Sequence, residues 1–174
     1  TSANPHGSTV VFDGAAAQTI PLNTSMVTTF GDIEISNTVS ATTDTSFEAS
    51  NLFGYFTVNS GGNFTQGNYS HLYSDSVANA GTYTYENSID FESSFTNTGT
   101  FTSSGGRIDI AGDWTNSGTY TYSNGDTVTF DGSTAQTITG SSTFSVLELS
   151  NTAASTVPTY DVTFASGSIN DVLS

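Results

Sequence analysis

One six-residue motif occurs three times, at nearly constant spacing, in the middle of this chain. The motif is Asn-x-Gly-Thr-aromatic-Thr, and its copies begin at Asn79, Asn97 and Asn116, so that successive copies lie 18 and 19 residues apart. A fixed short period indicates that each repeat is one supersecondary unit, which buries its apolar face only by stacking on its neighbours. The spacing therefore predicts a coil of stacked turns, each of roughly 18–19 residues.

The composition favours short β-strands joined by tight turns. The chain of 174 residues contains 31 Thr, 27 Ser, 17 Gly, 12 Phe and 8 Tyr. Thr, Tyr and Phe are enriched in strands, whereas Gly and Ser are enriched in turns. So much Thr, Ser and Gly is also compatible with disorder, but the aromatic content and the regular alternation of apolar residues favour a folded all-β chain.

Each repeat continues into a strand with two apolar positions. The first apolar position is occupied by Ile89, Ile108 and Val128, the second by Phe91, Ile110 and Phe130, and the position between them by Asp90, Asp109 and Thr129. Period-2 alternation places the apolar residues on the inner face and the acids on the outer face. A further element, at 94–96, 113–115 and 136–138, gives three strands per turn, which fits the triangular section of a parallel β-helix.

A longer duplication frames the chain. Residues 7–20 match residues 125–138 at ten of fourteen positions, and both copies run on into Phe-x-x-(Ile/Leu)-Glu-(Ile/Leu)-Ser-Asn-Thr, at 30–38 and 144–152. The first copy has four extra residues before this second segment, which we expect to form a loop. We interpret residues 1–174 as one solenoid domain, with a module at 7–124 and a partial second copy at 125–174.

These motifs resemble the β-helical repeat regions of large bacterial surface proteins. The features that carry the resemblance are Phe-Asp-Gly-x-x-Ala-Gln-Thr-Ile, the Glu-containing strand that ends in Ser-Asn, and the Asn-x-Gly-Thr-Phe-Thr turns between them. Filamentous-haemagglutinin-like adhesins and related secreted repeat proteins are the family in question. The resemblance covers nearly the whole chain, most clearly 79–152. It implies a right-handed parallel β-helix, export from the cell, and a role in adhesion or cell-surface structure.

The charge excludes several classes of partner. The formal net charge is −15, and Arg107 is the one Lys or Arg residue in the sequence. Nucleic-acid binding requires a basic face, and attraction to anionic lipid has the same requirement. No segment approaches the roughly 20 apolar residues of a membrane span. The Lys-free, Thr/Ser/Asn-rich surface favours an extracellular location, and the Asn-x-Ser/Thr matches at Asn23, Asn63 and Asn68 are of the kind that arises by chance in such a sequence.

Neither catalysis nor a cofactor is expected. The acidic residues are distributed by the repeat itself rather than clustered, which favours a solvated outer face over paired glycosidase carboxylates. Scattered, weak Ca²⁺ sites remain the alternative for these acids. His6 and His71 are isolated from each other and from any metal-binding motif.

The repeated aromatic and amide residues have two interpretations. We expect Tyr83, Phe101 and Tyr120 to stack inside the coil, and the motif Asn residues to form a side-chain amide ladder, with Asn also suited to a left-handed backbone conformation. The alternative is an exposed glycan-binding stripe, to which Tyr85, Tyr122 and the Asn residues would contribute.

The two ends of the coil are the strongest candidates for a functional surface. Neither end has the sequence of a polar cap, and strand-like apolar residues continue close to both termini. The residues concerned are Val10, Phe12 and Ile20 at the N-terminal end and Val162, Phe164, Ile169 and Val172 at the C-terminal end. We expect these ends to pair with copies of the same chain or with further repeats of a longer one, which would make the protein an extracellular fibre or stalk. The alternative is an adhesin segment that binds glycans.

Overall fold

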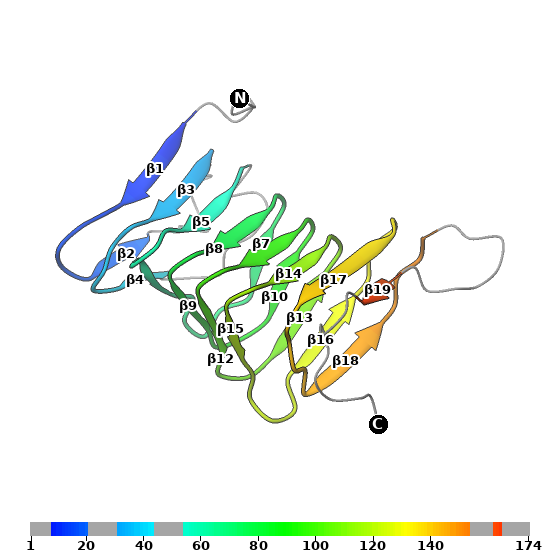
Figure 1. Cartoon of the computed structure of the whole chain (residues 1–174). Coiled ribbons are helices and arrows are strands. Elements are labelled where there is room, and N and C mark those ends of the chain that lie inside the picture. Colours follow the sequence, from blue (N-terminus) through cyan, green and yellow to red (C-terminus); the bar gives the residue numbers. More distant parts are fainter. Residues whose placement is uncertain (1–7, 21–30, 44–53, 154–161, 165–174) are drawn as a thin grey trace.

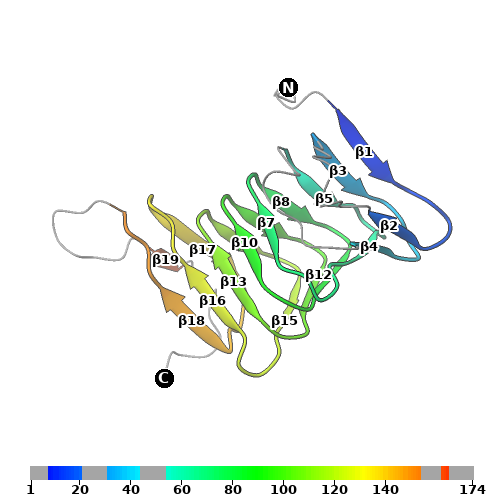
Figure 2. The same cartoon turned by 180° about the vertical axis from the view of Figure 1, so that it is seen from behind.

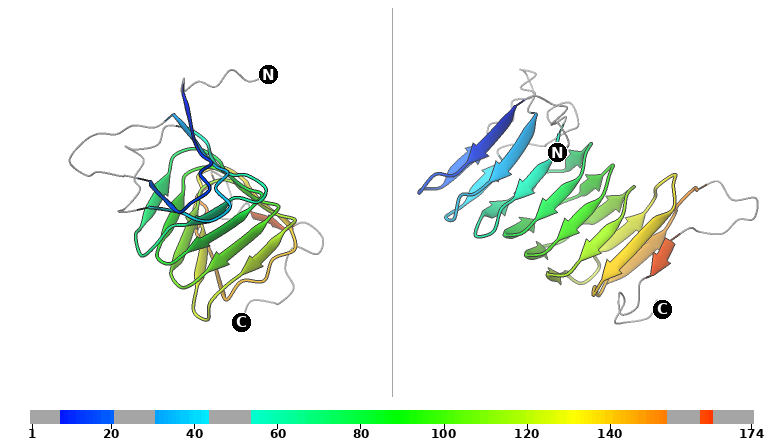
Figure 3. Two further views of the ribbon diagram at one scale, coloured as in Figure 1. Left: turned by 90° about the vertical axis from the view of Figure 1, so that its left-hand side faces the viewer. Right: turned by 45° about the horizontal axis from the view of Figure 1, so that its top comes forward.

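The chain forms a coil of parallel β-strands (Figure 1). The computed structural model describes residues 8–20, 31–43, 54–153 and 162–164, and these residues form nineteen strands and no helix. Every strand pairing among them is parallel. Successive turns lie side by side along the coil axis, from the N-terminal end to the C-terminal end, which both Figure 2 and the right-hand view of Figure 3 show. The predicted β-solenoid is confirmed.

The strands assemble into three sheets, which we call the first, second and third sheet in the order in which a turn visits them. The first sheet contains β1 (Thr9–Phe12), β3 (Asp32–Ile35), β5 (Phe56–Val58), β8 (Val77–Asn79), β11 (Phe95–Asn97), β14 (Trp114–Asn116), β17 (Gln136–Gly140) and β19 (Val162–Phe164). The second sheet contains β2 (Gln18–Ile20), β4 (Ala41–Thr43), β6 (Asn63–Thr65), β9 (Thr82–Tyr85), β12 (Thr100–Ser103) and β15 (Thr119–Thr121). The third sheet contains β7 (His71–Tyr73), β10 (Ile89–Phe91), β13 (Arg107–Ile110), β16 (Thr127–Phe130) and β18 (Val146–Leu149).

The length of a turn varies along the coil. The register gives 18 residues from Val77 to its partner Phe95 and 19 from Phe95 to its partner Trp114, which agrees with the motif spacing. From Trp114 to its partner Ile138, however, the chain takes 24 residues. The sequence alignment had placed Thr137 opposite Trp114, and this was wrong by one residue because the longer turn shifts the register.

The apolar columns predicted for the third sheet fill the interior. Ile89 pairs with Ile108 and Ile108 with Val128, and all three are at most 1% exposed. Asp90 and Asp109 face one another on the outside of the coil, as predicted. The alternation of a strand thus separates a dry interior from an acidic surface, and burial of the apolar columns is the main term that stabilises the coil.

The region 63–78, which fits the repeat only loosely in sequence, is regular in the structure. It contains β6, β7 and the start of β8. His71 lies in the inner column, opposite Ile89, and its Nδ1 contacts the carbonyl oxygen of Tyr69. Burial lowers the pKa of His71 to about 3, so that the ring is neutral at pH 7. His71 is therefore a core residue. His6 lies outside the described residues.

Aromatic side chains stack along the interior. Tyr83, Phe101 and Tyr120 occupy one column, with ring centroids 5.1 Å and 5.7 Å apart, as predicted. Trp114 is fully buried, and its indole N–H donates to the hydroxyl of Ser142 at 3.0 Å. Such contacts add to the stabilisation from burial alone.

The Asn and Gly of the repeated motif have separate structural roles. Asn79 donates from Nδ2 to Oδ1 of Asn97, and Asn97 donates in the same way to Asn116, both at 2.7 Å. A Cβ at Gly99 would lie 2.1 Å from the carbonyl oxygen of Gly81, one turn away, so that only Gly fits there. The amide ladder is confirmed, but the expected left-handed Asn is wrong, because no described non-Gly residue has a positive φ.

The amide ladder predicts that replacing its central residue, Asn97, strongly lowers the stability of the fold. Asn97→Leu leaves the Nδ2 of Asn79 without its acceptor on residue 97, and removes the donor to Asn116 Oδ1 and to the carbonyl oxygen of Thr119. Unsatisfied buried polar groups cost roughly 1–3 kcal/mol each, so we expect a loss of about 3 kcal/mol or more in the free energy of unfolding. Thr96→Val, on the exposed face of the same strand, is the control and should change stability by less than about 0.5 kcal/mol in urea titrations. Equal effects of the two substitutions would contradict the ladder.

Candidate functional site

The N-terminal end of the coil presents the edge of the first sheet. In the described part of the chain, β1 pairs with β3 and has no strand on its other side. The carbonyl oxygens of Ser8 and Phe12 accept hydrogen bonds from the β3 segment. Because the polar groups of successive residues in a strand point to opposite sides, those of Thr9 and Val11 face the open edge. This is the arrangement that pairs most readily with another strand.

The apolar residues predicted for this end differ in their availability. Phe12 is partly buried and packs against the core, and Val10 is half-buried. Val11, which alternates with them, is 47% exposed. The side chain of Ile20 is fully buried in the single chain, so at this end Ile20 can contribute only through the backbone of β2. Val10, Phe12 and Ile20 remain predicted residues of the pairing end.

The C-terminal end presents two strand edges. β19, which contains Val162 and Phe164, pairs with β17 and is the last described strand of the first sheet. β18 is the last described strand of the third sheet, and its Leu147 and Leu149 are partly buried. The sequence analysis missed Leu147 and Leu149 as end residues, although the match between 30–38 and 144–152 had marked this segment as a strand. The predicted end residues Ile169 and Val172 lie outside the described residues.

In each module a Gln side chain accepts hydrogen bonds from a backbone amide and from an Asn side chain, and we call this arrangement the Gln–Asn clip. It fixes the corner of the chain that leads into the Gln-containing strand. In the second module, Oε1 of Gln136 accepts from the amide of Gly132 at 3.0 Å and from Nδ2 of Asn151 at 2.6 Å. In the first module, Oε1 of Gln18 accepts from the amide of Gly14 and from Nδ2 of Asn37, both at 2.8 Å. The duplicated sequence thus builds the same hydrogen-bond arrangement twice.

The two clips differ in one respect. The Nε2 of Gln136 donates to the carbonyl oxygens of Ile110 and Gly112, in the preceding turn, at 2.8 Å and 2.7 Å. The Nε2 of Gln18 has no partner in the part of the chain that the structure describes, where β2 is the first strand of its sheet. The Gln18 amide therefore has an unused donor at the N-terminal end, and its counterpart shows what such a donor binds: backbone carbonyl groups of an earlier turn.

Equivalent strands of the two modules lie on different faces of the coil. β1 belongs to the first sheet, whereas its counterpart β16 belongs to the third; β2 belongs to the second sheet, whereas its counterpart β17 belongs to the first. From β1 to β14 the first sheet has six strands, so the chain makes five complete turns between them. From β14 the chain passes through β15 in the second sheet to β16 in the third, which is two thirds of a further turn. The module is therefore five and two-thirds turns long, and the second copy is rotated from the first by one third of a turn.

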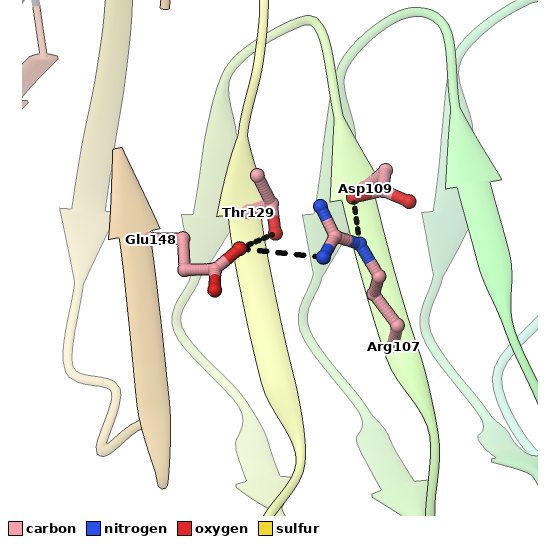
Figure 4. Close-up of polar contacts among 4 residues, drawn as sticks. All are labelled: Arg107, Asp109, Thr129 and Glu148. Carbon is pink, nitrogen blue, oxygen red and sulfur yellow. Dashed lines mark hydrogen bonds and ion pairs between the residues drawn. The ribbon is translucent and has the colours of Figure 1, made fainter. Parts of the chain in front are cut away.

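A short ionic network lies on the outer face of the third sheet (Figure 4). Arg107 donates from Nε to Oδ1 of Asp109 at 2.6 Å and from Nη1 to Oε2 of Glu148 at 3.3 Å, across the intervening strand β16. The hydroxyl of Thr129 donates to the same Glu148 oxygen at 3.2 Å. Arg107 thereby holds two of the acidic residues of this face together.

Two neighbouring carboxylates, those of Asp90 and Asp131, have raised pKa values. Burial raises the pKa of Asp90 to about 6, and the negative charges of Asp131, Asp109 and Glu92 contribute in the same direction. Burial followed by the charge of Asp109 also raises the pKa of Asp131. Among the described residues, no group of three or more His, Cys, Asp or Glu side chains could hold a metal ion.

The predicted glycan-contact residues are mostly inside the coil. Tyr85 is fully buried and stacks on Phe101, with ring centroids 5.2 Å apart, because it lies two residues from the inward-facing Tyr83 and therefore on the same face of the strand. The three motif Asn residues are at most 1% exposed. The predictions of a glycan contact at Tyr85 and at these Asn residues were therefore wrong. Tyr122, just after β15, is 38% exposed and remains a candidate.

Comparisons with known proteins do not add a function. No family model, curated protein or solved structure matches this chain. The likeness to filamentous-haemagglutinin-like adhesins thus stays a prediction from sequence motifs. No helix among the described residues is long and apolar enough to cross a membrane. The candidate site therefore rests on the geometry of the two ends.

The two Gln clips give a matched pair of substitutions. Gln136→Glu keeps an acceptor for Gly132 and Asn151 but places a carboxylate oxygen against the carbonyl groups of Ile110 and Gly112. A buried charge facing acceptors should cost about 3 kcal/mol or more. Gln18→Glu keeps the corresponding acceptor and loses no donated bond, so it should cost less than about 1 kcal/mol. Denaturant unfolding of both variants at low protein concentration and pH 7 tests this; similar losses would contradict the difference between the clips.

The raised pKa of Asp90, on the outer face of the third sheet, predicts that the folded state becomes more stable as the pH falls. The folded-state pKa of Asp90 lies above that of the free side chain, so protonation favours the folded state. The stabilisation that comes from protonated Asp90 is complete below about pH 3.8 and is lost as the pH rises through about 6. The melting temperature should thus increase between pH 7 and pH 4.5, and Asp90→Asn should raise it at pH 7 and reduce its pH dependence. Asp13→Asn, at an exposed turn, is the control; an identical pH profile in wild type and Asp90→Asn would refute this origin.

Proposed function

We propose that this protein is an extracellular structural protein that forms a fibre, stalk or surface filament by head-to-tail stacking of its coil. The observation that carries the proposal is the open edge of β1. The equivalent strand of the second module, β16, has β13 paired on the side that is open in β1. A contact between unlike ends is heterologous, and such a contact extends into an open filament when its rotation does not close a ring.

Charge supports contact through the ends rather than the sides. The chain carries a net charge of −15, so that the outer faces of two copies repel each other, except where salt screens them. The strands that form the N-terminal end, β1 and β2, contain no charged residue. Approach along the coil axis thus places the uncharged strands β1 and β2 against the other end, and backbone hydrogen bonds and apolar columns can extend across the junction. The Lys-free surface supports the extracellular location.

A single substitution in β1 tests the proposal. Val11→Pro removes an N–H that faces the open edge, so it should leave the pairing with β3 intact; proline is tolerated in edge strands for this reason. Val11→Thr is the matched control, because it keeps the N–H and the branched side chain. We expect wild type and Val11→Thr to form filaments in negative-stain microscopy and to sediment rapidly, and Val11→Pro to remain monomeric with an unchanged melting temperature. A wild-type chain that stays monomeric at high concentration, or a Val11→Pro variant that still polymerises, would overturn the proposal.

Glycan binding remains a second candidate because Tyr122 presents part of its ring to solvent. A glycan array separates the two functions. The structural proposal predicts no hit, whereas a specific hit that Tyr122→Ala abolishes and Tyr122→Phe retains would favour an adhesin segment.

A further inference from the structure

The geometry of the C-terminal end determines how a second copy can fit there. This inference rests on the proposed end-to-end stacking and specifies its contact. A neighbour's β1 and β2 belong to one turn and lie on adjacent faces, so they need two adjacent faces whose edges are at matching levels. A coil with three faces offers three possible rotations of the neighbour.

Among the residues that the structure describes, the last strands of the three sheets lie at different levels. The second sheet ends at β15, in the same turn as β14 and β16. The third sheet continues one strand further, to β18, and the first sheet continues two strands beyond β14, to β19. In place of a strand on the second face after β17, the segment around Ser142 and Phe144 covers the core, where Phe144 contacts Trp114 and Tyr120. The described strands thus end in a stepped edge, which we call the staircase, and β18 and β19 are the last two described strands of it.

Only one rotation matches this staircase. An unrotated neighbour would place β1 on β19 and β2 on the second face, where the last described strand, β15, lies two strand levels lower, or about 10 Å at roughly 4.8 Å per strand. The opposite rotation would place β1 above β15 and β2 on β18, a mismatch of one strand. With β1 on β18 and β2 on β19, the two edges follow one another along the coil just as β13 and β14 do.

The chain already contains this junction in its interior. β16 and β17, the counterparts of β1 and β2, lie on β13 and β14, which occupy the same two sheets as β18 and β19. We propose that a second copy docks on the C-terminal end rotated by one third of a turn, with its β1 on β18 and its β2 on β19. The rotation between subunits is then the rotation between the two modules of one chain.

Side chains at the two ends fit this register. In the interior, Val128 stacks on Ile108 and Phe130 on Ile110. The same register places the neighbour's Val10 on Leu147 and its Phe12 on Leu149, all of which are only partly buried in the single chain. The neighbour's Gln18 takes the position of Gln136, so its unused Nε2 faces the carbonyl groups of the corner that follows β18. The junction thus covers apolar residues and supplies acceptors for the Gln18 Nε2 donor, which has none among the residues that the structure describes.

Engineered cysteines distinguish the rotation from its alternative. The chain contains no Cys, and Thr9 and Val146 are exposed. The proposed docking sets Thr9 of one copy opposite Val146 of the next, at about 4.8 Å between strands, within the Cα range of a disulfide. An unrotated neighbour sets Thr9 opposite position 163 instead. We therefore mix Thr9→Cys with Val146→Cys, and separately with Thr163→Cys, under mild oxidation and at a concentration that gives filaments.

We expect at least ten times more covalent dimer in the Val146 mixture than in the Thr163 mixture. Thr9→Cys mixed with Tyr69→Cys, an exposed position away from both ends, gives the background from random collision. Filaments that cross-link through position 163, or through neither pair, would overturn the rotation but leave end-to-end stacking in place. Absence of filaments in all mixtures and in wild type would instead refute the proposed function.

Gln18→Glu provides a second readout that needs no cross-link. The variant keeps the acceptor for Gly14 and Asn37 but cannot donate to the neighbour, and a carboxylate there meets carbonyl groups. We expect the critical concentration for assembly to rise at least about tenfold, while the melting temperature of the monomer stays within a few degrees of wild type. Gln18→Asn, a shorter amide, should have an intermediate effect. Assembly of Gln18→Glu at the wild-type concentration would overturn the place of Gln18 in the junction.

Discussion

The register between parallel strands of successive turns is the constraint on which this structure depends. Each strand is paired on both edges in the middle of the coil, and its inner side chains fill columns that continue from one turn to the next. A one-residue slip would exchange the inner and outer faces of a strand, so that Ile108 and Ile110 would face water and Asp109 the core. Among the described strands, the same pairing leaves one edge of β1, β18 and β19 without a partner strand, and the proposed function follows from this difference between the middle and the ends.

Buried amides make the register specific. Apolar columns tolerate exchange among Ile, Val and Phe, and therefore select a register less sharply than a polar contact does. The ladder from Asn79 to Asn116 and the two Gln–Asn clips align donors with acceptors at fixed positions in each turn. Because an unpaired buried amide is costly, these side chains select one alignment of the turns. The clips recur with the module, and in the described part of the chain the Nε2 donor of the N-terminal clip, that of Gln18, has no acceptor.

Much of the coil could be predicted from the sequence, because repeats reveal which residues are equivalent. The columns through Ile108 and Ile110 followed from alternation and were confirmed. The register at Trp114 was wrong because the sequence does not show how many residues a corner takes, and the turn that starts at Trp114 is longer than the motif spacing. The one-third rotation could not be predicted for the same reason: it is the sum of the turn lengths along the module. The sequence left both a buried position and a glycan contact open for Tyr85, because exposed aromatic stripes show the same alternation as the strand that buries it.

Fibre diffraction from aligned filaments of the wild-type chain tests the central claim most directly. If copies stack end to end as continuations of one coil, the strands lie across the filament axis, and their spacing is uninterrupted at each junction. The account then predicts a sharp meridional reflection at about 4.8 Å. Filaments in which this reflection lies on the equator would show that the coils associate through their sides, and would contradict the account.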